Sequence, residues 1–164
     1  MSELDQKLLD FGISESFDEN DYYVSKSNYF AKNILETWPQ WEKKIVNLTG
    51  EKYSGKTHLS TILKTKSNAL YLLSKNIDNS TLKKIKLSNS IIIEDIDDTF
   101  DEKLLYSIFN LVEQDNKYLI VTSLKPIVDL GFKLKDLQSR TSNFILQNFE
   151  KPDDNPVSYT HLTL

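Results

Sequence analysis

One stretch in the first half of the chain constrains the fold and the chemistry together, because it fits the pattern G-x-x-x-x-G-K-[ST] without a mismatch. The stretch reads Gly50-Glu51-Lys52-Tyr53-Ser54-Gly55-Lys56-Thr57. It follows a short apolar run, Ile45–Leu48, and leads into the helical pattern of Lys56–Leu63. Glycines permit a tight backbone whose N–H groups turn toward phosphate oxygens, while the lysine reaches the outer phosphates and the final hydroxyl can ligate Mg²⁺. A turn without a ligand is the alternative. The agreement of strand, loop and helix favours a phosphate-binding loop.

Short apolar runs alternate with helical patterns along the rest of the chain. The predicted strands are Ile45–Leu48, Ala69–Leu73, Ser90–Ile93, Tyr118–Thr122 and Phe144–Leu146. The predicted helices are Ser27–Trp38, Lys56–Leu63, Thr81–Lys86, Glu102–Gln114 and Leu134–Ser139. Apolar strands alternating with helices predict an α/β domain, with a five-stranded parallel sheet flanked by helices and Ala69–Leu73 as a buried strand. A ligand of such a sheet belongs at the carboxyl ends of the strands.

Composition excludes several other classes of protein. The chain has 164 residues, of which 39% are hydrophobic and 27% charged, as expected of one globular domain. The absence of Cys excludes disulfides and a Cys nucleophile, and two distant His do not make a zinc site. A net charge of −4 argues against whole-surface attraction to nucleic acid. No apolar run approaches the ~20 residues of a membrane span, and no signal-peptide pattern begins the chain. We therefore expect a cytoplasmic protein.

Two acids follow the third apolar run at once. Glu94 and Asp95 come directly after Ser90–Ile93. A nucleotide hydrolase with a phosphate loop needs an acid at a second strand end, to hold Mg²⁺ and polarise the attacking water. Acids also end strands simply where the chain reaches water. Because adjacent strand residues point in opposite directions, the sequence leaves open which of the two acids faces the metal.

Arg140 is the single arginine among 20 basic residues. A planar guanidinium can fork onto phosphate oxygens in a way that lysine cannot imitate. An arginine finger, supplied to a neighbouring protein's nucleotide, is such a role. An ordinary surface residue is the alternative.

Six segments of the chain form a recognisable set, namely Tyr22–Asn28 (YYVSKSN), Trp38–Trp41 (WPQW), Gly55–Leu59 (GKTHL), Ile93–Asp95 (IED), Val121–Ser123 (VTS) and Leu137–Arg140 (LQSR). Together they resemble the AAA+ domain of the DnaA family, and within it most closely the Hda proteins, which regulate the replication initiator DnaA. The resemblance covers about residues 5–154. The phosphate loop alone is generic, whereas the WPxW spacer and the Glu-Asp strand end together are more specific.

The resemblance implies an AAA+ core that binds ATP or ADP with Mg²⁺. By the resemblance, Val24 and Asn28 match positions of the adenine pocket, and residues Gly50–Thr57 match the phosphate loop. Glu94 and Asp95 match the Walker B acids. Thr122 and Ser123 match the end of the sensor 1 strand, near the γ-phosphate. Thr57, Glu94 and Asp95 are the implied Mg²⁺ ligands. Arg140 matches the finger that reaches a neighbouring protomer's nucleotide.

The two ends of the chain are expected to lie outside this core, which we assign to residues 21–150. Residues 1–20 are expected to form a mobile tail, in which Gln6, Leu9 and Phe11 resemble a peptide that binds the DNA polymerase III sliding clamp. An incidental leucine pair is the alternative, and Lys7 departs from the family's apolar residue. The resemblance implies a helical lid after the core, which is absent after Asp154, and residues 157–162 resemble translated adaptor sequence. A truncated gene is therefore expected, with a natural short C-terminus as the alternative.

The function implied by the resemblance is regulatory inactivation of DnaA. Bound to the DNA-loaded clamp, the chain would present Arg140 to ATP on DnaA and promote its hydrolysis, a negative control of replication initiation. We expect the chain's own ATPase activity to be weak. We expect it to contact DNA only indirectly, through the clamp. A homo-oligomer of the chain is also possible. One alternative is the AAA+ domain of a DnaA-type initiator or loader truncated before its DNA-binding domain, although the short segment before the core favours Hda. A self-sufficient P-loop ATPase is the other alternative.

Overall fold

The protein forms a parallel five-stranded sheet in the computed structural model, which describes residues 26–141 and 143–149, with the backbone alone for residues 26–28, 30 and 31. The strands are β1 (Ile45–Gly50), β2 (Leu70–Leu73), β3 (Ser90–Ile96), β4 (Tyr118–Ser123) and β5 (Ile145–Phe149). Their order across the sheet is β2-β3-β4-β1-β5, and every neighbouring pair is parallel. The strand that carries the phosphate loop, β1, therefore lies between β4 and β5.

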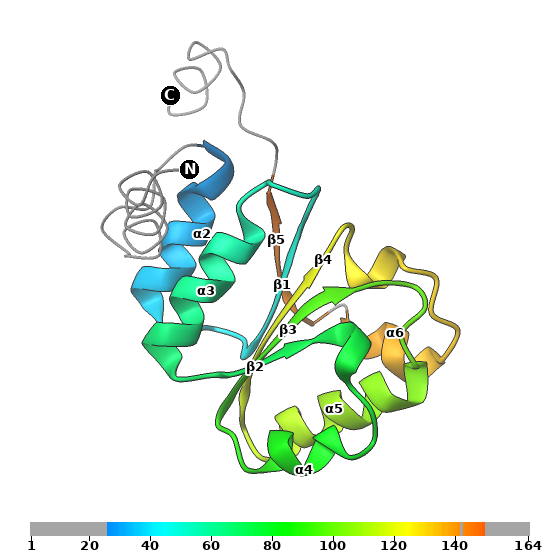
Figure 1. Cartoon of the computed structure of the whole chain (residues 1–164). Helices are drawn as coiled ribbons and strands as arrows, with labels where there is room; N and C mark the ends of the chain where they lie inside the picture. Colours follow the sequence, from blue (N-terminus) through cyan, green and yellow to red (C-terminus); the bar gives the residue numbers. More distant parts are fainter. Residues whose placement is uncertain (1–25, 142, 150–164) are drawn as a thin grey trace, which may run out of the picture.

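Helices cover both faces of the sheet, as the sequence predicted (Figure 1). The α-helices are α2 (Lys26–Thr37), α3 (Lys56–Ser67), α4 (Thr81–Lys86), α5 (Glu102–Gln114) and α6 (Lys135–Thr141). Short 3₁₀ turns occur at η2 (Ser74–Asn76) and η3 (Ile127–Asp129). Helices α2 and α3 lie on one face, and α4, α5 and α6 on the other. None of the helices in this described part is long and apolar enough to cross a membrane.

Two apolar cores stabilise this arrangement, one on each face of the sheet. Ile91 and Ile93 of β3 belong to the core that includes Phe109 of α5. Ile92, between them, belongs to the other core, with Leu59 of α3. All five side chains are fully buried. Successive side chains of a strand point to opposite faces of the sheet. A strand that is covered on both faces therefore needs apolar residues at every position, which gives a continuous apolar run.

The expectation of a buried strand at Ala69–Leu73 is wrong. Strand β2 begins at Leu70 and lies at the edge of the sheet, where it pairs with β3 alone. Its side chains are half-buried, and Leu73 is 37% exposed. At the opposite edge, β5 begins at Ile145, one residue later than predicted, and runs to Phe149. Phe144, just before the strand, packs into the core. An apolar run does not reveal how many neighbours a strand has.

The register between β3 and β4 shifts by one residue at the two acids. Ile93 pairs with Val121, but the next pair is Ile96 with Ser123, so β3 contains one more residue than β4 over this stretch. The extra residue returns Ile96 to the same core as Ile93. Asp95 lies in this bulge with φ 63°. Bulges of this kind re-aim side chains and are common beside functional sites.

The WPQW segment has a structural role at the end of the sheet remote from the phosphate loop. The Trp38 and Trp41 rings meet edge to face, and Trp38 also contacts the Tyr118 ring at the start of β4. Trp41 Nε1 donates to the carbonyl of Ile34 at 2.8 Å, and the Tyr118 hydroxyl donates to that of Pro39 at 3.0 Å. These contacts attach the end of α2 to the sheet, which is the kind of tertiary contact that helps to stabilise a helix.

Candidate functional site

The phosphate loop connects the end of β1 to the start of α3, as its sequence pattern requires. Gly50 has φ 145° and Gly55 has φ 108°, both outside the range that L side chains adopt readily. A Cβ atom at Gly50 would lie 2.4 Å from the carbonyl oxygen of Phe149 in β5. Only glycine fits at that position, because a neighbouring strand's backbone cannot move aside.

An open pocket of about 820 Å³ lies against this loop. Its wall is formed by loop and first-turn residues, by the end of β3 and by the residue after β4, namely Lys52, Tyr53, Ser54, Gly55, Lys56, Thr57, His58, Asp95, Ile96, Asp97 and Leu124. The pocket therefore lies at the carboxyl ends of the parallel strands, where the sequence predicted a ligand site. A volume in this range suits a small organic ligand.

Lys56 is buried beside the pocket and is held by backbone carbonyls. Its Nζ donates to the carbonyl of Gly50 and, at 3.3 Å, to that of Ser123. Burial lowers the pKa of Lys56 below its ordinary value, and the negative charges of Asp95 and then Glu94 act in the opposite direction. The ammonium group is thus oriented toward the loop from the first turn of α3.

The loop offers an anion several unused donors. Helix α3 has Gly55 as its N-cap and no side-chain cap or acidic residue in its first turn, so its first N–H groups keep the partial positive charge of a helix N-terminus. The Ser54 hydroxyl is buried and lacks a hydrogen-bond partner within the described chain. Together with the Lys56 ammonium, these groups fit a phosphate. Mg²⁺ prefers oxygen ligands, and both Thr57 and Asp95, which line the pocket, can supply one.

The two strand-end acids have different surroundings. Glu94 is only 2% exposed, and its carboxylate accepts hydrogen bonds from the Ser60 hydroxyl on α3 and, at 2.7 Å, from the Thr122 hydroxyl on β4. Burial and the nearby Glu94 charge raise the pKa of Tyr71, on β2, to about 12. Asp95 is exposed and lines the pocket. Asp95 is therefore the acid that faces the pocket, while Glu94 is enclosed by hydroxyl groups.

Thr122 and Ser123 are buried behind the pocket wall rather than on it. The Thr122 hydroxyl, besides donating to Glu94, accepts from the backbone N–H of Asp95 at 2.9 Å, so one hydroxyl connects both acids. Ser123 Oγ accepts from Asn47 Nδ2 at 2.9 Å. These residues lie beside the predicted site as support for its acids.

Asn47 is a supporting residue that the sequence reasoning missed. It is 2% exposed in the middle of β1, and its Oδ1 accepts from the backbone N–H of Ile127 at 2.9 Å. With its bond to Ser123, this holds the turn after β4, whose Leu124 lines the pocket. The available signal was a polar residue inside the apolar run IVNL, since a buried amide requires partners.

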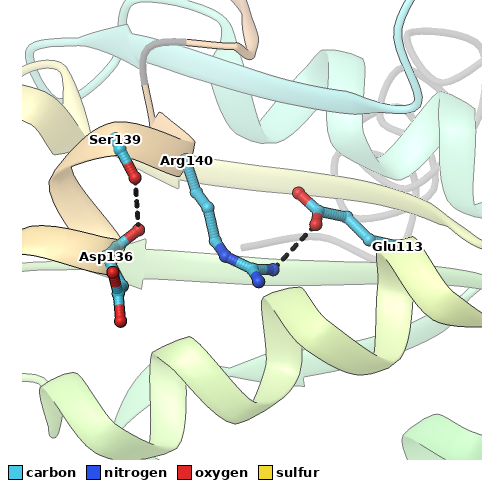
Figure 2. A network of polar contacts seen from close by, with 4 residues as sticks. All are labelled: Glu113, Asp136, Ser139 and Arg140. Atoms are coloured by element: carbon cyan, nitrogen blue, oxygen red, sulfur yellow. Dashed lines mark hydrogen bonds and ion pairs between the residues drawn. The ribbon is translucent and has the colours of Figure 1, made fainter.

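Arg140 lies on α6 and is not part of the pocket wall. Figure 2 shows its guanidinium reaching from α6 to Glu113 on α5, where Nη1 lies 2.7 Å from Oε2. The guanidinium also lies over the Tyr106 ring, 4.9 Å from its centroid. The predicted finger residue thus contacts α5 of its own chain.

Five predicted residues have no described side chain. Val24, Gln6, Leu9 and Phe11 lie outside the described residues, as do all of residues 1–20 and 151–164. Asn28 lies in α2, where only its backbone is described. The adenine-pocket and clamp-peptide assignments therefore stay predictions.

Comparison with solved structures identifies the fold. AMPPCP-bound DnaA from Aquifex aeolicus matches with a TM-score of 0.71 at 17% identity, over 90% of this chain and 54% of that one. Domain III of DnaA from Thermotoga maritima matches with a TM-score of 0.67 at 18% identity, over 84% and 68%. A DNA replication initiation factor matches with a TM-score of 0.70 at 18% identity, over 82% and 49%. The fold is that of a DnaA AAA+ domain.

The comparisons by sequence add nothing to this result. No family model matches the chain, and no curated protein matches it. The chain spans about half the length of the Aquifex aeolicus DnaA structure and of the DNA replication initiation factor.

Proposed function

We propose that this chain is an AAA+ module that binds ATP or ADP with Mg²⁺ and acts in the initiation of chromosomal replication. The observation that carries the proposal is the set of donors at the start of α3, where the Lys56 ammonium, the unpartnered Ser54 hydroxyl and uncapped helix N–H groups lie together. The DnaA-like fold supports the same conclusion, as does the presence of AMPPCP in two of the similar DnaA structures.

Each part of the site has a distinct task in this proposal. The loop N–H groups and Lys56 bind and orient the phosphates, and Mg²⁺, when bound, would neutralise phosphate charge. Asp95 faces the phosphates and orients water, while the Thr122 hydroxyl holds the Asp95 backbone and the Glu94 carboxylate in fixed relation. Such preorganised charge is the usual source of catalysis in phosphoryl transfer.

The finer proposal is a regulator of the Hda kind. The chain would bind the DNA-loaded sliding clamp in the cytoplasm through Gln6–Phe11 and supply Arg140 to ATP on DnaA. Arg140 lies away from the chain's own pocket, which supports action on a neighbour's nucleotide. In this proposal the chain's own ATPase activity is weak, because its finger serves another protein.

A DnaA-type initiator domain is the second candidate. One similar structure is DnaA bound to AMPPCP and single-stranded DNA, with a TM-score of 0.71 at 14% identity. The genomic reading frame downstream separates the two candidates, since the initiator requires a DNA-binding domain after the AAA+ module.

Nucleotide binding is tested by comparing a lysine of the loop with a lysine outside the pocket. Lys56→Ala removes the buried cation of the site, whereas Lys83→Ala removes an exposed lysine of α4. Ligand at a hundredfold excess over Kd stabilises a protein by about 2.7 kcal/mol. We expect ADP or ATP with Mg²⁺ to raise the Tm of the wild type and of Lys83→Ala, but not that of Lys56→Ala. Equal shifts in all three proteins would contradict the proposal.

The regulatory role is tested by single-turnover hydrolysis of labelled ATP preloaded on DnaA, with DNA-loaded clamp. An ammonium cannot fork across developing γ-phosphate charge. We expect the Arg140→Lys variant to lose most of the stimulation of DnaA while retaining its own nucleotide affinity. Full stimulation by Arg140→Lys would show that Arg140 is an ordinary surface cation.

The clamp-binding peptide is tested separately. Replacement of Gln6, Leu9 and Phe11 by Ala should abolish binding to the clamp.

A further inference from the structure

Two bulky or charged side chains on the pocket wall are attached to a left-handed backbone. In the described chain, the non-glycine residues with positive φ are Tyr53, Asn68, Asp95 and Asn116. Asparagine adopts this conformation readily, and Asn68 does so as the C-cap of α3. The remaining two, Tyr53 at φ 64° and Asp95 at φ 63°, line the same pocket. Strained backbone that is retained at one site indicates a task at that site.

The strain at Asp95 is offset by neighbouring groups, whereas that at Tyr53 is not. The Asp95 N–H donates to Thr122, and its carbonyl accepts from the Ser74 hydroxyl at 2.6 Å. The Tyr53 side chain is 96% exposed and makes no hydrogen bond or ring contact with the described residues. A left-handed conformation is unfavourable for a residue that carries a Cβ atom. The exposed ring gains none of the stabilisation that burial of a large apolar side chain supplies.

The position of Tyr53 shows where its ring can be buried. It stands in the phosphate loop between Lys52 and Ser54, directly before the residues that offer donors to an anion. Leu124, on another part of the pocket wall, is also apolar and 62% exposed. Its carbonyl accepts from the Gly50 N–H at 3.2 Å, which fixes it to the same loop. A ligand seated on the loop would therefore lie beside two exposed apolar side chains.

We propose that Tyr53 packs across a nucleoside di- or triphosphate bound on the loop and slows its release. The proposal rests on nucleotide binding by this pocket, and it adds a residue that sets how long the nucleotide stays. The ring is solvated before binding and becomes buried against the ligand. Aromatic contacts of this kind stabilise a complex beyond the simple burial of apolar area.

The test measures the release of N-methylanthraniloyl-ADP chased by excess ADP in a stopped-flow fluorimeter. Three variants separate the ring from the backbone. Tyr53→Phe keeps the ring, Tyr53→Gly removes both the ring and the strain, and Tyr53→Asn removes the ring but keeps a side chain that tolerates positive φ. We expect release about tenfold faster from the Gly and Asn variants, a change of ~1.4 kcal/mol in barrier, and a rate near wild type from the Phe variant.

Each other outcome is decisive. Release of the nucleotide from Tyr53→Asn at the wild-type rate overturns the inference. This holds even if Tyr53→Gly releases it faster, because fast release from the Gly variant alone would reflect greater flexibility of the loop. Slower release from Tyr53→Gly overturns it as well. If the wild-type chain binds no labelled ADP, the proposed nucleotide site fails together with it. Denaturant unfolding of the ligand-free Tyr53→Gly variant should show equal or higher stability, which establishes that faster release is not a folding defect.

Discussion

The replacement Gly50→Ala isolates the packing that positions the phosphate loop. A Cβ atom at this residue would lie 2.4 Å from the Phe149 carbonyl oxygen, 2.9 Å from Ser54 Oγ and 3.0 Å from Phe149 Cβ. Ser54 can rotate, but the Phe149 carbonyl belongs to the paired strand β5. Overpacking costs about 1–3 kcal/mol, and a positive φ of 145° adds backbone strain of about 1–3 kcal/mol. We expect a total loss of unfolding free energy of about 2–6 kcal/mol.

Gly131→Ala is the matched control for this prediction. Gly131 has φ 81°, but a Cβ there would meet no atom within 4 Å, so only the backbone contribution of roughly 1–2 kcal/mol applies. Urea unfolding followed by circular dichroism gives the two losses, and nucleotide-dependent Tm shifts report the state of the loop. If Gly50→Ala costs no more than Gly131→Ala, the contact between β1 and β5 does not set the loop, and the steric reasoning is refuted.

Three further predictions concern the acids, the finger and pH. Thr122→Val removes the hydroxyl shared by Glu94 and the Asp95 backbone, so we expect about 1–3 kcal/mol loss of stability in urea unfolding; a change below ~0.5 kcal/mol would contradict the network. Arg140→Ala breaks a partly exposed ion pair, so we expect at most ~1 kcal/mol loss by the same measurement, and a much larger loss would show that the residue is structural. The Tyr71 pKa is raised to about 12 in the folded chain, so the unfolded state loses this proton first and stability falls as pH rises from ~10 toward that value. Tyr71→Phe should flatten this alkaline decline in unfolding free energy, and an unchanged slope would contradict the burial of the phenol beside Glu94.

Local sequence was sufficient to predict the order of the elements and the position of the loop. Apolar runs identified all five strands, and the bounds of α4 and α5 agree with those predicted. The GxxxxGKT pattern placed Lys56 at the start of a helix, and the structure has it there. Such features depend on residues within a few positions of one another, which is why periodicity and turn chemistry reveal them.

The surroundings of the site came only from contacts between distant parts of the chain. The bulge in β3 depends on its pairing with β4, and it brings Asp95 to the pocket while Glu94 is enclosed by Ser60 and Thr122. The support from Asn47 likewise depends on an element 80 positions further along.

The sequence by itself determined that this α/β chain has a glycine-containing loop with a lysine at the start of a helix, and two acids at the end of another strand. The tertiary structure decided which acid faces the pocket, which strand lies at the edge of the sheet, and that Arg140 contacts Glu113 instead of its own loop. The physical reason is that a side chain's environment is set by its neighbours in space, and in a parallel sheet those neighbours come from strands separated by long crossover connections.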